Sequence, residues 1–388
     1  MFAHHQTQAI NPSYLSDPRN WPSFEGPTAQ SRPSRPDDHD LVRRAGEQAQ
    51  LLVPANLKRA RAGGGGLAET LAALLASRTL NFNRGGVREV ILPAITRAVA
   101  AGEPIRVVMP AFCKVGHGAK LMFNQGPSAA EAVSIRHLAH VSRQLTRLYS
   151  PGVGFVMVTD ARLYAAWLRN PAPTATAYNQ ALRELAGQLA TEAEVRLVEY
   201  DELLQHDARQ FETFYGAGWR MVQTQDARLL SSLSPDELYE SVRCSMNTQV
   251  LGMSLDDLRA CFGPQPDRSH RLFGTIAGFA RESAEEMLAV RYACRSLEKQ
   301  VFTRAFGPNY IRATVHVSRQ NPILGLRLFP DYKRASLQLP YHGVPLLEEE
   351  GTRVRMLVAP ETRYYFDPNL ERVEDLSGQT WFYRRHES

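Results

Sequence analysis

Residues 104–110 read Pro-Ile-Arg-Val-Val-Met-Pro, and residues 153–159 read Val-Gly-Phe-Val-Met-Val-Thr. Both runs are short, almost continuously apolar and rich in β-branched residues, and an amphipathic helical pattern lies between them. This combination predicts a βαβ unit whose parallel strands are buried on both faces. A third run of the same type, Val-Arg-Leu-Val-Glu-Tyr at residues 195–200, follows a second helical pattern. The sequence therefore predicts a Rossmann-like α/β fold with a mostly parallel sheet flanked by helices.

The rest of the chain divides by composition into segments around this core. Residues 1–38 are rich in Pro, Ser, Gln, Asn and His, which predicts an N-terminal extension that is flexible or draped over the periphery of the fold. The Rossmann-like core is expected over residues 39–205, and a helical region follows at 206–304. Short β-type runs with tight turns predict a C-terminal mixed or antiparallel β region at 305–388 that completes the site. These runs form either a second sheet or an extension of the first.

The overall composition is that of an ordinary globular protein. The 388 residues carry a net charge of +5, with 44% hydrophobic and 22% charged residues, and the arginines are scattered along the chain. A nucleic-acid surface needs basic runs and a membrane span needs about 18 apolar residues, so neither is expected. The four cysteines are far apart with no C-x-x-C pair, which argues against zinc and disulfides and fits a reducing compartment. We expect a cytoplasmic protein that binds neither nucleic acid nor membrane.

Familiar nucleotide-binding and catalytic signatures are absent from the sequence. No G-x-G-x-x-G follows the first predicted strand, and the chain has no Walker A, G-x-S-x-G or H-E-x-x-H pattern. A nucleotide cofactor and a metal site are therefore not expected.

Charged residues follow two of the predicted strands where each strand ends. The first strand is followed by Lys114 and, beyond a glycine-containing turn, by Lys120; the second is followed by Asp160 and Arg162. Ligands of open α/β sheets bind at the carboxyl ends of the strands, and lysine beside a glycine-containing loop suits a phosphate. A single Lys or Arg at such a position is more often a solvated surface group. The prediction of a site therefore rests on the group of residues.

Three histidine and arginine positions in the C-terminal region extend this set. Arg312 and His316 are four residues apart in a β-type run, so in a strand their side chains share one face. His342 lies in a Pro-Tyr-His-Gly turn that would expose its imidazole. A lone histidine is more often structural than catalytic, and that interpretation stays open for both.

Glu131 also has two interpretations. It comes three residues after Ser128 at the start of a helical pattern, which predicts a capping box. The alternative is that its carboxylate faces a ligand.

Three blocks of the sequence resemble the isocyanide (isonitrile) synthases, also called the pyoverdine/dityrosine biosynthesis family. Residues 110–114, Pro-Ala-Phe-Cys-Lys, with the later Lys120 and Glu131, are similar to the family's Pro-Ala-Phe-Pro-x-Lys-Ser-Pro-Asn segment. Residues 159–164, Thr-Asp-Ala-Arg-Leu-Tyr, are similar to its Ser-Asp-Gly-Arg-x-Phe. The last block, Ile-Arg-Ala-Thr-Val-His followed by Pro-Tyr-His-Gly, is similar to Ile-Arg-Leu-Ser-Ile-His followed by Pro-Trp-His. The order and intervals of the blocks agree over most of the chain.

This resemblance implies an enzyme of natural-product biosynthesis. In the family, the amine of an amino acid condenses with the ketone of ribulose 5-phosphate, and the adduct fragments to an isocyanide. The resemblance implies no redox cofactor and no metal, with ribulose 5-phosphate as co-substrate. The implied partners are the two small-molecule substrates. The resemblance is also compatible with a tailoring oxygenase that acts downstream in the same pathway.

The resemblance also implies roles for the residues at the strand ends. The expected catalytic residues are Lys114, His316 and His342. The expected substrate-binding residues are Lys120, Glu131, Asp160, Arg162 and Arg312, with the lysines and Arg312 as phosphate or carbonyl cations.

The chain departs from the family pattern at several of these positions. Val115-Gly116-His117 follow Lys114 where the family has Ser-Pro-Asn, Ala161 replaces a glycine, and Tyr341 replaces a tryptophan. We therefore expect a divergent member. Two alternatives stay open: a related sugar-phosphate-dependent lyase or transferase with a non-isocyanide product, and a non-catalytic binding protein on the same fold.

Overall fold

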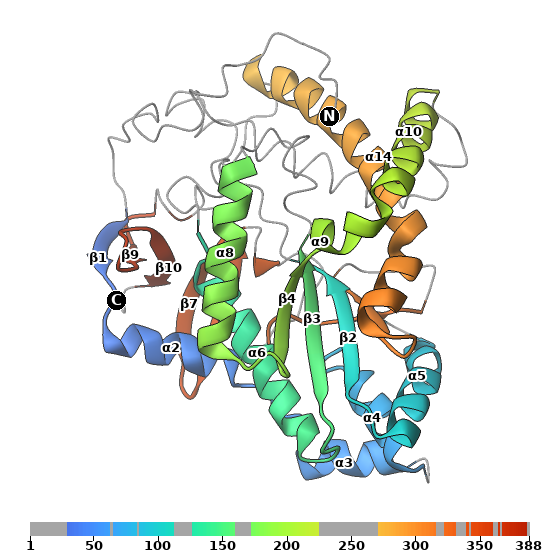
Figure 1. Ribbon diagram of the computed structural model, residues 1–388. Coiled ribbons are helices and arrows are strands. Elements are labelled where there is room, and N and C mark those ends of the chain that lie inside the picture. Colours follow the sequence, from blue (N-terminus) through green and yellow to red (C-terminus); the bar gives the residue numbers. More distant parts are fainter. Residues whose placement is uncertain are drawn as a thin grey trace.

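The strands that the computed structural model describes form two sheets, one parallel and one mixed (Figure 1). The structure describes residues 29–62, 65–83, 85–111, 126–159, 172–224, 271–315, 322–330, 339–340, 343–359, 364 and 367–385. Helix α6 (Ala129–Thr146) contacts strands of both sheets and so joins them.

The parallel sheet has the strand order β4-β3-β2-β5-β6. Its strands are β2 (Ile105–Pro110), β3 (Val153–Thr159), β4 (Val195–Glu199), β5 (Ile311–Thr314) and β6 (Leu324–Gly325). Every neighbouring pair is parallel. The three strands predicted from apolar runs are confirmed, and so is the α/β fold. Two of the C-terminal β runs, which the sequence left open between two sheets, extend this one as β5 and β6.

Side chains of the parallel sheet alternate between two layers of helices. Val107 and Met109 of β2 pack in one core with α4, α5, α6 and α8, whereas Val108 packs in another with α9, α10 and α14. The bounds of these further helices are α4 (Leu67–Leu75), α5 (Val87–Ala101), α8 (Ala172–Leu189), α9 (Tyr200–Leu204), α10 (Ala208–Gln223) and α14 (Arg271–Phe306). Because both faces are covered, the strands are apolar on both sides, which explains their continuous hydrophobic runs. Within the described residues, no helix combines the length and apolarity that a membrane crossing requires.

The mixed sheet has the order β1-β9-β10-β7-β8. Its strands are β1 (Gln30–Pro33), β7 (Val344–Glu350), β8 (Arg353–Ala359), β9 (Leu370–Glu374) and β10 (Thr380–Arg385). The β7–β8 and β9–β10 pairs are antiparallel, whereas β10–β7 and β1–β9 are parallel. The predicted mixed C-terminal β region is confirmed. Helices α2 (Pro36–Gly46) and α3 (Pro54–Arg61) precede the parallel sheet in the chain, and α2 packs against β8.

Strand β1 lies within residues 1–38, where the sequence predicted a flexible or draped extension. Gln30–Pro33 pair with β9, and the Arg32 guanidinium forms ion pairs with Asp38 at 2.5 Å and with Glu371 at 2.8 Å. Of the two expectations for this extension, the contacts of residues 30–38 match a segment draped over the edge of the mixed sheet. Composition alone could not show it, because the partner strand comes from the other end of the chain.

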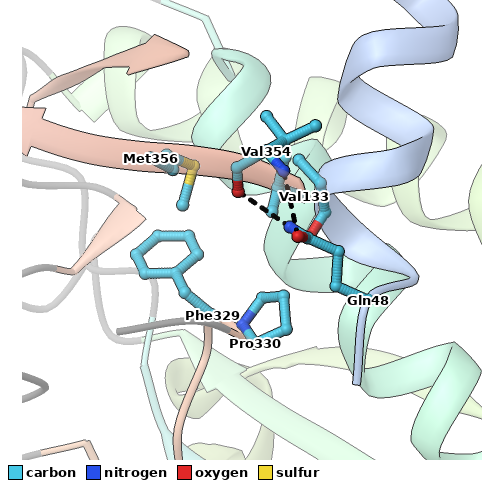
Figure 2. Close-up of a pocket in the computed structure, with 7 residues that line it drawn as sticks. Gln48, Val133, Phe329, Pro330, Val354 and Met356 are labelled. Carbon is cyan, nitrogen blue, oxygen red and sulfur yellow. Dashed lines mark hydrogen bonds between the residues drawn. The ribbon is translucent and has the colours of Figure 1, made fainter. Parts of the chain in front are cut away.

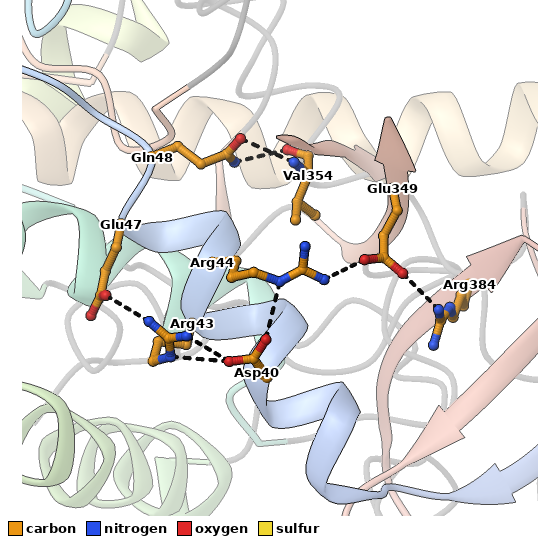
Figure 3. A network of polar contacts seen from close by, with 8 residues as sticks. All are labelled: Asp40, Arg43, Arg44, Glu47, Gln48, Glu349, Val354 and Arg384. Carbon is orange, nitrogen blue, oxygen red and sulfur yellow. Dashed lines mark hydrogen bonds and ion pairs between the residues drawn. The ribbon is translucent and has the colours of Figure 1, made fainter. Parts of the chain in front are cut away.

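A network of polar side chains fastens α2 and the residues after it to the mixed sheet (Figure 3). Arg44 of α2 forms an ion pair with Glu349 of β7, and the same carboxylate accepts a hydrogen bond from Arg384 of β10 at 2.8 Å. The Gln48 side chain donates to the carbonyl of Val354 at 2.9 Å and accepts from its N–H at 3.0 Å. The two Gln48 hydrogen bonds satisfy the backbone groups of Val354 on the edge strand β8, which would otherwise be open to another chain.

Candidate active site

The strand order of the parallel sheet reverses between β2 and β5. From β2 the chain continues through β3 to β4 on one side, and later places β5 and β6 on the other side. The register pairs Val107 with Ile311 and Val108 with Arg312. In open α/β sheets, ligands bind at the carboxyl ends of the strands that flank such a reversal. We therefore place the candidate site at the carboxyl ends of β2 and β5, with β3 beside them.

Six of the eight predicted site residues lie outside the described residues: Lys114, Lys120, Asp160, Arg162, His316 and His342. In the sequence, Lys114 comes four positions after Pro110, the end of β2, and His316 comes two positions after Thr314, the end of β5. These are the two strands that flank the reversal. Their pairing is a relation between distant segments that the sequence alone did not give. The roles of these six residues stay predictions.

Glu131 caps helix α6. Its Oε2 accepts hydrogen bonds from the backbone N–H of Ser128 at 2.7 Å and from the Ser128 hydroxyl at 2.6 Å. Its Oε1 accepts a hydrogen bond at 3.0 Å from the hydroxyl of Tyr178 on α8. Ser128 and Glu131 are fully buried, so these bonds are shielded from water. Of the two interpretations of Glu131, the contacts described here match the capping box, and they tie the start of α6 to α8.

A buried polar pair at the end of β3 was not among the predicted site residues. The hydroxyl of Thr159, the last residue of β3, donates to the amide oxygen of Asn179 on α8 at 3.3 Å, and each residue is 1% exposed. The amide nitrogen of Asn179 is buried and has no hydrogen-bond partner. A sequence signal was available, because Asn179 lies beside Tyr178 and three positions before Leu182, two apolar positions of the predicted helix. A polar residue at such a position has to find a buried partner.

Arg312, predicted as a phosphate or carbonyl cation, already has a carboxylate partner. Its Nε lies 2.5 Å from Glu298 Oε1 on α14, and its Nη2 lies 2.9 Å from Glu298 Oε2. This two-point contact fixes the plane of the guanidinium and offsets its charge. Burial raises the pKa of the neighbouring Tyr310, the Glu298 carboxylate adds to that shift, and Arg312 opposes it. The described contacts of Arg312 thus join β5 to α14.

A second arginine–carboxylate group lies at the end of β4. Arg183 of α8 is 3.2 Å from Glu199, the last residue of β4, and 2.8 Å from Glu202. Glu199 is 4% exposed and was not among the predicted site residues. Within the described part of the chain, these carboxylates do not form a metal site, and no other cluster of three His, Cys, Asp or Glu side chains does so.

A small pocket lies between α2, α6 and β8 (Figure 2). It is lined by Ala45, Gln48, Val133, Phe329, Pro330, Val354 and Met356, none of which was predicted as a site residue. The lining is mostly apolar, and the polar atoms of Gln48 are already bonded to Val354. The polar atoms of Gln48 are therefore not available to a ligand in this pocket. Its lining residues pack α2 against the mixed sheet.

The family model described as "Pyoverdine/dityrosine biosynthesis protein" matches residues 95–363. The chain belongs to the pyoverdine/dityrosine biosynthesis family. The matched range begins within α5 and includes β2 to β8 and all eight predicted site residues. The resemblance recognised from three sequence blocks is thereby confirmed.

Curated relatives within this family are named as isonitrile or isocyanide synthases. An L-tyrosine isonitrile synthase from Pseudomonas aeruginosa is 25% identical over 269 residues, which cover 68% of this chain and 76% of that protein. The isocyanide synthase xanB from Aspergillus fumigatus is 22% identical over 304 residues, 76% of this chain and 38% of that protein. The chain thus spans less than half the length of this fungal relative.

The fold of this family member is also seen in a solved structure. The crystal structure of the PvcA protein from Pseudomonas aeruginosa superposes with a TM-score of 0.57 and 22% sequence identity. The superposition covers 77% of this chain and 92% of the other. At this level of identity the likeness establishes a shared fold.

Proposed function

We propose that this protein is an isocyanide synthase that condenses the amine of an amino acid with ribulose 5-phosphate and fragments the adduct to an isocyanide. The observation that carries the proposal is the pairing of β2 with β5 at the strand-order reversal. The chain continues from these two strands to Lys114 and His316, which belong to the blocks that resemble the family. Relatives named as isonitrile and isocyanide synthases support the same reaction class.

The first chemical step defines what the site has to supply. The amine attacks the sugar ketone, the carbonyl oxygen leaves as water, and a carbon–nitrogen double bond forms. The step needs a group that protonates the departing oxygen, a base that accepts the protons of the amine, and cations that hold the phosphate. Later eliminations and a carbon–carbon cleavage leave the former ketone carbon on nitrogen.

The proposed roles follow the chemistry of the side chains. We assign phosphate binding to Lys114 and Lys120, because the charge of Arg312 is already offset by Glu298. His316 and His342 are the proposed acid and base, since an imidazole changes its charge near neutral pH. Asp160 and Arg162 are proposed to orient the amino acid.

The direct test is turnover with defined substrates. Purified protein is incubated with ribulose 5-phosphate and a panel of amino acids that includes L-tyrosine, and products are identified by mass spectrometry. We expect an isocyanide with at least one amino acid. The absence of isocyanide formation with every amino acid tested would refute the proposal, and so would the absence of ribulose 5-phosphate binding in calorimetry.

Variants of the proposed catalytic residues test the site. We expect His316→Ala to lower kcat/KM by about 100-fold or more, the usual range for loss of a general acid or base. Lys114→Ala should lower kcat/KM by weakening the binding of the phosphate. Arg385→Ala, at an exposed position of the mixed sheet, is the control and should keep wild-type turnover. Wild-type kcat/KM in both site variants would contradict the assigned roles.

A second reaction is motivated by the sequence after Lys114. Val115-Gly116-His117 stand where the family resemblance has Ser-Pro-Asn, next to the proposed phosphate lysine. A changed turn there favours a related lyase or transferase that uses the same sugar phosphate and releases an imine or formylated product. Ribulose 5-phosphate consumption with a product other than an isocyanide would support this second reaction.

A further inference from the structure

Asn179 has a buried amide of which only one polar atom has a hydrogen-bond partner. Its oxygen accepts one hydrogen bond from Thr159, while its nitrogen, a donor of two hydrogens, has no partner. If the amide is turned over, the nitrogen donates to the Thr159 hydroxyl and the oxygen is left without a partner. In either orientation one polar atom of the amide is buried and unpaired.

Such a group is unfavourable in the free protein. Leaving a buried donor or acceptor unpaired costs roughly 1–3 kcal/mol, which the native fold has to offset elsewhere. Unpaired buried polar groups are uncommon in native structures, and each one needs an explanation, such as a functional role or a partner that binds later. A polar group of a bound ligand would supply the missing hydrogen bond.

The amide is held at a defined place in the fold. Its neighbour in sequence, Tyr178, donates to Glu131 at the start of α6, and Glu131 is fixed by Ser128. Asn179 itself contacts the last residue of β3, at the carboxyl end of the sheet where ligands of this fold class bind. The chain therefore presents a pre-positioned amide beside the reversal between β2 and β5.

The chemistry around Asn179 favours an uncharged oxygen as its partner. The next cation along α8, Arg183, is engaged by Glu199 and Glu202, and the Glu131 carboxylate lies close to Tyr178. Within the described part of the chain Arg183 is therefore already paired, so it supplies no counter-charge for a phosphate or carboxylate buried against the neutral amide, and burial of an anion requires one. A hydroxyl or carbonyl oxygen needs no counter-charge.

We propose that Asn179 is a substrate-binding residue that hydrogen-bonds a hydroxyl or ketone oxygen of the sugar phosphate. This proposal rests on the proposed function, which supplies a substrate of that class. The sugar is favoured over the amino acid because the amine and carboxylate of an amino acid are charged, whereas the sugar carries several neutral oxygens. The amide then distinguishes the sugar portion from the phosphate, which the lysines hold.

The test separates binding from stability in the variant Asn179→Leu, which is close in size and has no polar atom. Calorimetric titration with ribulose 5-phosphate should give a Kd about tenfold higher than wild type, the effect of one lost hydrogen bond. The Tm of the ligand-free variant should equal or exceed that of wild type, because an unpaired buried group has been removed. Titration with inorganic phosphate alone should be unchanged.

A matched control is Ser134→Ala on α6. The Ser134 hydroxyl is also buried and unpaired, so its removal should affect Tm in the same direction. It should leave the Kd for ribulose 5-phosphate unchanged. If Asn179→Leu fails to fold, Asn179→Ser is measured under the same criteria.

Several results would overturn the proposal. A wild-type Kd for ribulose 5-phosphate in a folded Asn179 variant would do so, as would equal weakening of inorganic phosphate binding. A wild-type protein that binds ribulose 5-phosphate but makes no isocyanide refutes the proposed function, while the Kd comparison still decides the role of Asn179. A wild-type protein that does not bind the sugar phosphate refutes both.

Discussion

The two sheets of this protein are built from different kinds of sequence. The strands of the parallel sheet are covered by helices on both faces and are mostly apolar, and the buried polar residues Thr159 and Glu199 lie at the carboxyl ends of β3 and β4. The mixed sheet carries charges along its strands, which pair across neighbours, such as Arg385 of β10 with Glu348 of β7. The difference indicates a division of labour. The parallel sheet carries the candidate site, and the mixed sheet packs against helices α2 and α6.

The largest expected effect concerns the core of the parallel sheet. Phe155 of β3 is 1% exposed and among the largest fully buried side chains of the described residues. Phe155→Ala should lower the free energy of unfolding by about 4 kcal/mol, because it removes apolar contacts and leaves a cavity. Urea denaturation measures the change. The control Leu376→Ala, at a fully exposed position, should change it by less than about 0.5 kcal/mol.

The next effect concerns Asp38, whose carboxylate contacts arginine side chains at the edge of the mixed sheet. Burial raises the pKa of Asp38, but the hydrogen bonds from Arg32 and the Arg35 backbone, with the charges of Arg32 and Arg384, outweigh it and lower the pKa below its usual value. At pH 7, Asp38→Asn should lower the free energy of unfolding by about 2–3 kcal/mol, as expected for hydrogen bonds to a buried charged group.

The pH dependence of this variant has a defined sign. Because the folded pKa of Asp38 is lowered, its contribution is fully present above the unfolded pKa of about 4 and is lost as pH falls through the folded value. The difference in unfolding free energy between wild type and Asp38→Asn should therefore be constant from pH 8 to 5 and shrink in stronger acid. Asp40→Asn, on the exposed side of the same helix, is the control. An equal loss in the control would contradict the special role of Asp38.

A third effect concerns His137 on α6, the helix between the two sheets. Burial lowers the pKa of His137 from 6.5 to about 3, the charge of His140 adds to the shift, and the Arg327 backbone opposes it. No hydrogen bond of ordinary length and angle reaches either ring nitrogen, so the Arg327 backbone compensates the burial of the ring only weakly. Below pH 6.5 the unfolded chain binds a proton that the folded protein does not, so stability falls as pH decreases toward the folded pKa.

The variant His137→Leu isolates this effect. Relative to wild type, it should gain about 2 kcal/mol in unfolding free energy between pH 7 and 5, at about 1.4 kcal/mol for each pH unit below 6.5. Guanidinium denaturation at a series of pH values measures the gain. From pH 7.5 to 8.5 both proteins are neutral at this position and their difference should be flat. A pH-independent difference over the whole range would show that folding does not shift the pKa of His137.

The smallest effect is expected from the surface charges of the mixed sheet. Glu349→Gln breaks the ion pairs with Arg44 and Arg384, whose side chains are about one-third exposed. The loss should be below about 1 kcal/mol and should diminish with added salt, because solvent and ions screen such pairs. Thermal unfolding at low and high salt measures it. A loss as large as that of Phe155→Ala would remove the contrast between the sheets.

Much of the parallel sheet was predictable because its signals are local. The apolar runs that became β2, β3 and β4 need only a window of a few residues, and the capping box of Ser128 and Glu131 spans four positions. The sheet to which each C-terminal strand belongs was harder to predict from the sequence. Residues 311–314 and 344–350 have similar β character, yet the first joins the parallel sheet and the second the mixed one.

The candidate site was predictable in residue type more than in arrangement. The sequence indicated charged residues after strand ends, but it gave Arg312 no partner, whereas the fold brings Glu298 from α14 to its guanidinium. It also gave no sign that Asn179 would keep an unpaired amide against Thr159. Both facts depend on the packing of helices against strands that lie far away in the sequence.

The sequence by itself determined the buried parallel strands, the family to which the chain belongs and the residue types available for chemistry. Only the tertiary structure decided that β5 pairs with β2, that β1 pairs with β9, and that α8 turns Asn179 toward the end of β3. The physical reason is the distance along the sequence over which each interaction acts. Strand and helix formation follow from patterns within a short window, whereas strand order and side-chain partners are set by burying surfaces that distant segments share.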